Sequence, residues 1–440
     1  MRQESVYGQV AFSACLTGLL ALVLLPSFTA PIALVGLALT LTFTGFACDC
    51  VATAKDKDVA PKGLLFVWLI AAALLLSLAT QTHNWQGVER VTIWVACCCG
   101  CITVKNRARG CSRQRQLIQS ILLLFVTLAL RALAERFYLY SMLRELAGGM
   151  GFEAPDAEYA GFFGSARARA TFGQANGFAG FLLLLLPLII AMSSVTLRSK
   201  KSWFFVVLSV LCLWASGSKG GTLVYIFIAG VCLLRWSGNL IVKRLARVLL
   251  AIAVVGLSAC LLSLIDGALP SSLEGLFETF RLRQGYWITA LSMIGSEGAI
   301  GVGAGLFGES FYLFTDTNTS FSRFAHNGYL GIAAEFGLIG ILLVGILVWA
   351  WWKSKPVPTE PEPEPEPEPE LDGIKRIPIE FIGAFLISAP SFSLNLLAEG
   401  GWWTACFTML PIVLGLHHFI GRDVVTKTVA RVDRLKQAAW

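Results

Sequence analysis

The feature that most constrains this sequence is a series of long apolar runs that recurs along most of the chain. Of the 440 residues, 56% are apolar and only 14% are charged, whereas soluble domains carry roughly a quarter charged residues. A helix of about 20 mainly apolar residues crosses a bilayer core that is about 30 Å thick. The sequence therefore predicts an all-α, polytopic membrane protein with a single integral membrane domain over residues 1–440, and it excludes a row of soluble domains.

We expect about twelve transmembrane helices, one for each apolar run. The runs lie near residues 10–26, 30–47, 64–80, 91–104, 117–134, 176–195, 203–217, 222–236, 248–265, 328–352, 378–397 and 402–420. Pro26 and Phe28 directly follow the first run, and no small-residue cleavage site stands there. We therefore interpret the first run as a retained span rather than as a signal peptide.

The positions of Lys and Arg predict the orientation, because loops that stay in the cytoplasm carry an excess of these residues. With the N-terminus inside, every inner segment is basic, as residues 105–115 and 422–436 illustrate. Both termini are then cytoplasmic. The formal net charge of +7 follows from this topology, so the basic balance does not indicate a nucleic-acid partner.

Two predicted outer segments are long enough to have a structure of their own, and such long loops often carry function. Residues 135–175 are expected to form an interfacial helix and then an irregular periplasmic loop. Residues 266–327 are expected to form the periplasmic catalytic loop, with an amphipathic helix over 277–294 before a glycine run at 301–308. On the inner side, residues 353–377 contain a Pro-Glu repeat that predicts an extended cytoplasmic linker.

Ten cations lie on or near the predicted outer side, where the topology rule gives no reason for them. They are Arg90, Arg131, Arg136, Arg144, Arg167, Arg169, Lys219, Arg281, Arg283 and Arg323. An outward anionic partner is one explanation. The other is interfacial anchoring by long side chains, which we favour for Arg131, Arg136 and Arg144.

A cluster of cysteines could indicate a metal site and a run of glycines a nucleotide-binding loop, but the surrounding residues support neither. Residues 97–101 include four cysteines, but this run is apolar, and no His or carboxylate stands at ligand spacing. Free Cys in such a run acts as a small hydrophobe, so we predict no metal and no cofactor. Gly301, Gly303 and Gly305 follow no predicted strand. They indicate a turn or a close backbone approach rather than a nucleotide loop.

His326 has the richest setting of the four histidines, because Asn327 and Tyr329 follow it and lead into the apolar run that carries Glu335. We expect Asn327 to cap this helix, with the positive helix end beside His326. An imidazole, with an ordinary pKa of about 6.5, can accept a proton near neutral pH. These residues alone leave catalysis and interfacial anchoring open for His326. They also leave function and helix packing open for Glu335.

The sequence from His326 to Gly337 resembles a motif of the O-antigen ligase and polymerase superfamily. The matching residues are His326-Asn327-Gly-Tyr329-Leu330 and Glu335-Phe-Gly337. Three further pieces match in order: residues 172–179 leading into 185–188, then Ser216-Gly-Ser218-Lys219-Gly220, and then Arg283-Gln-Gly-Tyr-Trp287 followed by residues 301–303. The predicted topology, with its largest outer loop before the tenth span, is also similar to that of the family.

The resemblance implies a glycosyltransferase of the bacterial inner membrane that uses a glycan carried on undecaprenyl diphosphate, without nucleotide or metal, at the periplasmic face. It implies His326 as the base for the acceptor hydroxyl and Arg283 as a cation for the leaving diphosphate. Further diphosphate-binding candidates are Arg281, Lys219, Arg169 and Arg167, and supporting candidates are Asn176, Asn327, Tyr329 and Glu335. The family pattern has Arg where this chain has Lys219, which lacks the guanidinium fork.

We expect an O-antigen ligase that moves its glycan to a lipid A-core acceptor among the membrane lipids. A polymerase of the same superfamily, with a second lipid-linked glycan as acceptor, is the alternative. A transporter or lipid flippase is less favoured, because transporters bury ionisable groups near the bilayer midplane. Here most such groups lie at the ends of the predicted spans.

Overall fold

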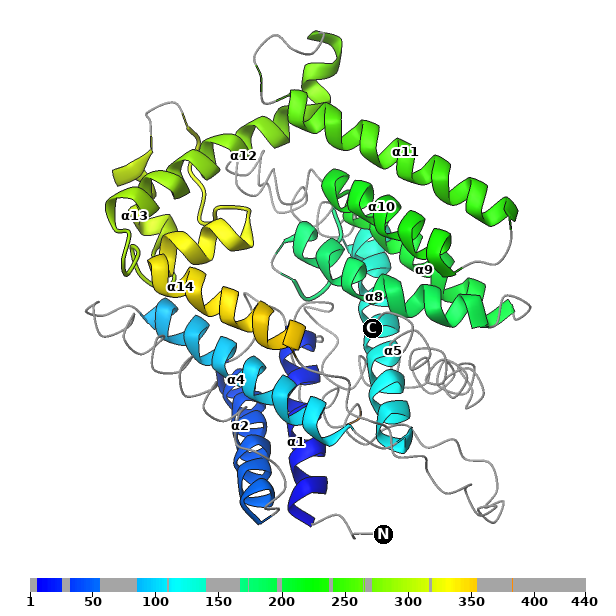
Figure 1. Ribbon diagram of the computed structural model, residues 1–440, viewed down its shortest axis with the longest axis vertical. Coiled ribbons are helices and arrows are strands. Elements are labelled where there is room, and N and C mark those ends of the chain that lie inside the picture. The colour runs from blue at the N-terminus through cyan, green and yellow to red at the C-terminus, as the bar shows by residue number, and fades with distance from the viewer. Residues whose placement is uncertain are drawn as a thin grey trace, which may run out of the picture. The chain divides into compact units, whose positions relative to one another are not determined.

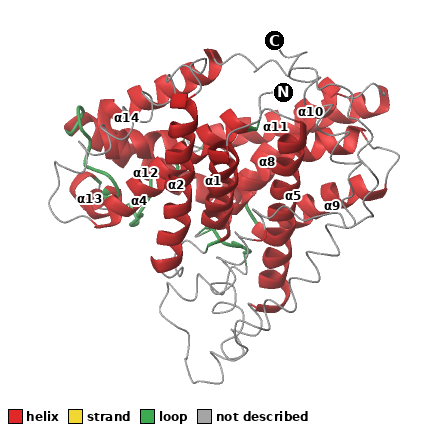
Figure 2. Ribbon diagram, turned by 90° about the horizontal axis from the view of Figure 1, so that it is seen from below, coloured by secondary structure: helices red, strands yellow, loops and turns green. Residues whose placement is uncertain are grey.

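The computed structural model describes about three fifths of the chain, and all its regular elements there are helices (Figure 2). The described residues are 6–25, 32–55, 85–108, 111–139, 167–172, 174–195, 200–236, 240–263, 265, 271–315, 319–353 and 382. No strand occurs within these ranges. For this part of the chain, the all-α prediction is confirmed.

The helices follow the apolar runs along the chain (Figure 1). They are α1 (Val6–Leu24), α2 (Ile32–Lys55), α4 (Trp85–Arg107), α5 (Cys111–Ala134), the π-helix η1 (Glu135–Leu139), α8 (Ala175–Val195), α9 (Lys200–Ser216), α10 (Lys219–Trp236), α11 (Leu240–Leu262), α12 (Ser271–Ser296), α13 (Phe307–Phe314) and α14 (Gly328–Lys353). Each predicted run within the described ranges coincides with one of these helices. The runs at 64–80, 378–397 and 402–420 lie outside the described residues, as does the 359–370 Pro-Glu tract.

Four stretches of the described chain are long and apolar enough to cross a bilayer. They are Tyr7–Leu24, Leu34–Val51, Gln116–Tyr138 and Leu240–Leu262, and they contain 18 to 23 residues each. Shorter apolar stretches lie at Val95–Val104, Ala175–Leu186, Phe204–Ser216 and Gly328–Leu342. These helices indicate a membrane protein, since about 20 apolar residues span the hydrocarbon core. The number of spans and the orientation stay predictions.

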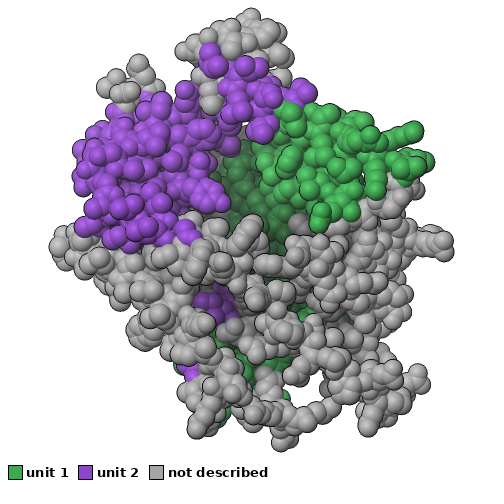
Figure 3. Space-filling model, viewed as in Figure 1, with its two compact units in different colours: residues 1–49, 103–254, 359–440 green, residues 50–102, 255–358 purple. Residues whose placement is uncertain are grey.

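The helices belong to two compact units, which Figure 3 distinguishes by colour. The first unit includes residues 1–49 and 103–254. In it, α8 packs against α9 and α10, and α5 packs against α1 and α9. The fully buried rings of Phe125 in α5 and Phe205 in α9 have centroids 6.4 Å apart. The apolar run around Phe125 is buried on all sides, which explains why that stretch shows no polar face.

The second unit includes residues 50–102 and 255–358. In it, α12 packs against α13 and α14. One face of α12 is buried, because Ala290 and Met293 are fully buried whereas Leu291 remains 56% exposed. The amphipathic character of this helix stays a prediction. The helix also begins six residues before the expected 277. The sequence analysis did not predict α13, which buries Phe307 and Phe311 one turn apart.

A glycine-rich loop joins α12 to α13 and docks on a kink in α14. Gly337 interrupts α14 with a φ of 58° and a ψ of −148°. In a regular helix, the Ala334 carbonyl would accept from the Leu338 N–H. Here Val302 N–H donates to the Ala334 carbonyl, at 2.9 Å, and Leu338 N–H donates to the Gly298 carbonyl, at 2.9 Å. The loop therefore satisfies the backbone groups that the kink exposes, and the predicted close backbone approach is confirmed.

Candidate functional site

Three residues of the predicted motif share one face of α12. Arg283, Tyr286 and Trp287 lie three and four residues apart, so their side chains are neighbours on the helix surface. The Tyr286 ring lies beside the His326 imidazole, with centroids 5.3 Å apart and planes tilted by 34°. The Tyr286 hydroxyl lies 3.2 Å from Ser320 Oγ. This face of α12 therefore brings its aromatic and cationic residues to the histidine that precedes α14.

Asn327 caps the N-terminus of α14, as the sequence predicted. Its Oδ1 accepts hydrogen bonds from the backbone N–H groups of Tyr329, at 3.1 Å, and Leu330, at 3.3 Å. The Asn327 carbonyl also accepts from Gly331 N–H, at 2.8 Å, which begins the helical hydrogen-bond series. His326 precedes the cap with a φ of 50°, a left-handed conformation in which His is several-fold enriched over most residue types. The cap thus fixes the backbone on which the imidazole stands.

The pKa of His326 lies below its ordinary value. Desolvation by the surrounding protein is the larger cause, and the positive charge of Arg283 is the second. His326 nevertheless keeps part of its surface exposed to solvent. A lowered pKa favours the neutral imidazole, which can accept a proton. At neutral pH, His326 is therefore in the protonation state that a general base needs.

Arg283 and Trp287 present hydrogen-bond donors that the described part of the chain does not satisfy. Arg283 is half-buried, and its guanidinium makes no hydrogen bond or ion pair with another described residue. Trp287 Nε1 is buried without an acceptor among the described residues. A buried indole N–H usually has a partner. A water or a ligand can therefore supply the acceptor for the Trp287 N–H. Arg281 stands on another side of α12, because two residues rotate a helix by about 200°.

Glu335 binds the glycine loop. Its Oε2 accepts a hydrogen bond from Gly305 N–H, at 3.0 Å, and its carbonyl accepts from Gly303 N–H, at 2.9 Å. This contact gives Glu335 a structural role in the packing of α14, one of the two roles that its sequence position left open. The side chain of Tyr329, the second residue of α14, is 76% exposed.

A second group of motif residues meets in the first unit. Arg167 Nε donates to the Ser216 carbonyl, at 2.9 Å, and Arg167 Nη2 donates to Asn176 Oδ1, at 3.0 Å. Ser218 Oγ donates to the same Asn176 oxygen, at 2.8 Å. Gly217, with a φ of 57°, packs against Arg167, and a Cβ there would lie 3.3 Å from Arg167 Cγ. The motif pieces at 172–179 and 216–220 are thus joined through Arg167. Lys219 comes directly after this turn, as the exposed first residue of α10.

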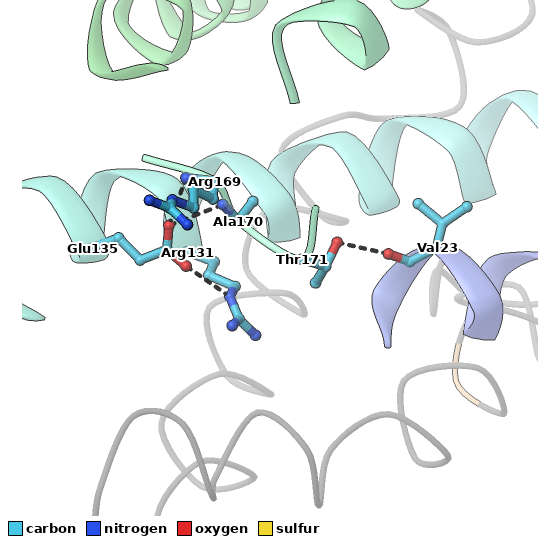
Figure 4. A network of polar contacts seen from close by, with 6 residues as sticks. All are labelled: Val23, Arg131, Glu135, Arg169, Ala170 and Thr171. Atoms are coloured by element: carbon cyan, nitrogen blue, oxygen red, sulfur yellow. Dashed lines mark hydrogen bonds and ion pairs between the residues drawn. The ribbon is translucent and has the colours of Figure 1, made fainter. Parts of the chain in front are cut away.

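The predicted role of Arg131 as an interfacial anchor is wrong. Arg131 is only 5% exposed, and its Nε lies 3.1 Å from Glu135 Oε1 (Figure 4). The side chain therefore forms a buried ion pair rather than reaching a membrane interface. Arg136 lies over the Trp214 ring, with its Cζ 5.1 Å from the centroid, while Arg144 lies outside the described residues. Sequence reasoning missed Glu135, although its spacing of four residues from Arg131 on an apolar helix is a signal for such a pair.

The structure therefore collects the predicted site residues in two groups, one in each unit. The second unit holds His326, Arg283, Arg281, Asn327, Tyr329 and Glu335, and the first holds Arg167, Arg169, Asn176 and Lys219. Within the described ranges, no group of three or more His, Cys, Asp or Glu side chains is arranged to hold a metal ion.

The fold and the group in the second unit define a helical membrane protein with a histidine directly before α14 whose pKa is lowered by burial and by the charge of an arginine. Residues 204–345, from within α9 to within α14, match the family model Wzy_C, described as O-antigen ligase. This match covers about a third of the chain and supports the resemblance to the O-antigen ligase and polymerase superfamily that the sequence motifs indicated. The comparisons with curated proteins and with solved structures gave no match.

Proposed function

We propose that this chain is an O-antigen ligase-type transferase at the periplasmic face of the bacterial inner membrane. It moves a glycan from undecaprenyl diphosphate to a sugar hydroxyl of a lipid A-core acceptor. The observation that supports this function best is the contact of the His326 ring with Tyr286, on the face of α12 that also carries Arg283, inside the segment that matches the family. A polymerase of the same superfamily would use the same chemistry with a second lipid-linked glycan as acceptor.

His326 serves as the general base in the proposed step. Its neutral imidazole takes the proton of the acceptor hydroxyl while the hydroxyl oxygen forms a bond to the anomeric carbon of the donor sugar. The bond between that carbon and the diphosphate oxygen breaks, and the electron pair leaves with undecaprenyl diphosphate. The exposed part of His326 gives the acceptor access to the imidazole.

Arg283 binds the leaving diphosphate. Its guanidinium can donate two parallel hydrogen bonds to phosphate oxygens, and hydrogen bonds to charged groups contribute roughly 1.5 to 3 kcal/mol each. The buried Trp287 N–H, one turn further along the same face of α12, supplies another donor that has no acceptor among the described residues. Neutralisation by these donors makes the diphosphate a better leaving group. No metal ion is needed for this step, and we expect transfer to continue in excess EDTA.

Cations of the first unit are proposed separately as phosphate-binding candidates. Arg169 and Lys219 are the candidates for direct contact, with Lys219 acting as a point charge. Arg167 donates to Ser216 and Asn176, so we assign it mainly to holding the motif together. Arg281, on a different side of α12 from Arg283, is a secondary candidate in the second unit.

Deletion of the gene followed by glycolipid analysis tests the function. Long glycan that accumulates on undecaprenyl diphosphate indicates a ligase, whereas single repeat units attached to the lipid A-core indicate a polymerase. Glycolipid flux across proteoliposome membranes, with no glycan joined to any acceptor, would instead indicate a transporter and would exclude both the ligase and the polymerase function. A reporter fused near residue 300 is expected on the periplasmic side, and cytoplasmic labelling would overturn the proposed location of the site.

A further inference from the structure

Glu135, the first residue of η1, lies at the centre of a buried polar network in the first unit (Figure 4). The residue is 6% exposed. Its Oε1 accepts from Arg131 Nε, at 3.1 Å, and its Oε2 accepts from the backbone N–H groups of Arg169 and Ala170, each at 2.9 Å. Both carboxylate oxygens are therefore used, one for a side chain of the same helical stretch and one for a loop more than thirty residues away.

The loop that Glu135 holds has a backbone that needs support. Ala170 has a φ of 52°, and a non-glycine residue in this region persists only where its surroundings fix it. Thr171 Oγ1 donates to the Val23 carbonyl at 2.7 Å, and Ala168 N–H donates to the Ala215 carbonyl at 2.9 Å. These bonds fix the two sides of the turn. Glu135 binds the turn itself, through two successive N–H groups.

This loop carries cations into the group of motif residues. Arg167 joins Ser216 to Asn176, and Arg169 provides one of the N–H groups that Glu135 binds. Lys219 begins α10 directly after the same Ser216–Ser218 turn. Within this network, Glu135 supplies negative charge to Arg131 and hydrogen-bond acceptors to the loop backbone. The position of the Arg169 main chain therefore depends on the Glu135 carboxylate.

We propose that Glu135 is a positioning residue of the transferase. It fixes residues 167–171 so that Arg169 is held where it binds the diphosphate of the lipid-linked donor. Glu135 acts by fixing this loop rather than by contacting the donor. The identity of the substrate rests on the proposed function, whereas the hydrogen bonds of Glu135 do not depend on it.

A matched pair of variants isolates the acceptor role of Glu135. Loss of one partner of a buried ion pair leaves an uncompensated charge, so both variants carry Arg131→Met. The first combines it with Glu135→Gln, whose amide oxygen can still accept from the loop. The second combines it with Glu135→Met, which has nearly the same shape and accepts no such bond. Any other contact of Arg131 is lost equally in both variants.

The measurements are hydrogen exchange at the loop and steady-state kinetics of the full-length protein in nanodiscs. Relative to the Gln variant, the Met variant is expected to show faster exchange of the Arg169 and Ala170 amides. Its KM for the lipid-linked donor should rise about tenfold with little change in kcat, as expected when an interaction made equally in the ground and transition states is lost. Arg169→Gln should raise this KM in the Gln background and change it little in the Met background, because residues that act through one another are not additive.

Equal donor KM values for the Gln and Met variants would overturn the inference, as would an equal effect of Arg169→Gln in both backgrounds. If the Met variant does not fold, Glu135→Asp with Arg131 unchanged replaces it and is compared with the wild-type protein, because it keeps the ion pair's charges but shortens the reach to the loop. The same rise in KM is then expected, and an unchanged KM would be contrary to the inference. If the wild-type protein transfers no glycan, the proposed function fails. The Kd of inorganic pyrophosphate for the same variants then decides the role of Glu135 separately.

Discussion

Gly301 and Gly337 approach each other so closely that neither position has room for a side chain. A Cβ at Gly301 would lie 2.6 Å from Gly337 N, and a Cβ at Gly337 would lie 2.6 Å from Gly301 N. Both residues also have positive φ values, of 77° and 58°, which favour glycine. The loop after α12 and the kink of α14 therefore depend on each other.

Gly301→Ala or Gly337→Ala is expected to destabilise the second unit by about 1–3 kcal/mol, because the new methyl group meets backbone atoms and the conformation disfavours a side chain. Thermal unfolding in detergent measures the effect. Gly295→Ala in α12 is the matched control, since a Cβ there meets nothing within 4 Å. It should be neutral or stabilising, by up to about 1 kcal/mol. Equal unfolding temperatures for all three variants would contradict the close approach.

His326→Ala is expected to abolish glycan transfer, with a loss of at least about 100-fold, because a general base contributes roughly 10² to 10⁴ in rate. His326→Asn is the control for the backbone, since Asn also tolerates the left-handed conformation that His326 adopts. Both variants should be inactive and should accumulate in the membrane at wild-type levels. An active Asn variant would remove His326 from the role of base.

The pH dependence of transfer should show an acidic limb with a midpoint below the ordinary His value of about 6.5. Desolvation and the charge of Arg283 both lower the pKa of His326, so the neutral base persists to lower pH and activity is lost as pH falls through the lowered value. Arg283→Gln should raise the His326 pKa, and Arg283→Lys, which keeps the charge, should raise it less. NMR titration of His326 measures the difference. The same pKa in both variants would refute the electrostatic coupling.

Arg283→Lys is expected to lower kcat/KM about 10- to 100-fold, because lysine lacks the fork that binds phosphate oxygens in pairs. Arg281→Lys should have a smaller effect, since Arg281 stands on a different side of α12 from the His326 group. Kinetics with the lipid-linked donor compare the two variants. If only Arg281→Lys is impaired, the diphosphate contact belongs to Arg281.

Trp287→Phe is expected to raise the donor KM about tenfold, because it removes the indole N–H that would donate a hydrogen bond to a phosphate oxygen. The ring contact with Phe280, with centroids 5.5 Å apart, should largely survive in the variant. Phe280→Leu serves as the packing control, because it changes the same contact and leaves the N–H in place. If the two variants have the same donor KM, Trp287 contributes packing alone.

Local sequence signals predicted much of this structure. Long apolar runs indicated helices because, within a bilayer, a single run of that length satisfies its own backbone hydrogen bonds only as a helix. The Asn327 cap was predictable from a polar residue directly before such a run. By contrast, α13 has only eight residues, too few for a periodic pattern to be distinguished from a loop.

The parts of the site that depend on distant residues were harder to predict. The order of the family motifs indicated that Arg283 and His326 act together, and the structure gives that pairing its electrostatic basis. Nothing local to Arg169 indicated that its N–H would bind Glu135, because the two residues are 34 positions apart. The Arg131 ion pair was missed for a different reason. The surrounding aromatic residues favoured an interfacial anchor, whereas tertiary packing buries the guanidinium.

The spacing of Arg131 and Glu135 limits how this chain can change in length. The two residues are four positions apart across the junction of α5 and η1, and each residue added to or removed from a helix rotates the remainder of that helix by about 100°. A single-residue insertion or deletion between them would turn the carboxylate away from its partners. Length variation among homologous chains is therefore expected outside this turn, and gaps in an alignment should not fall within it.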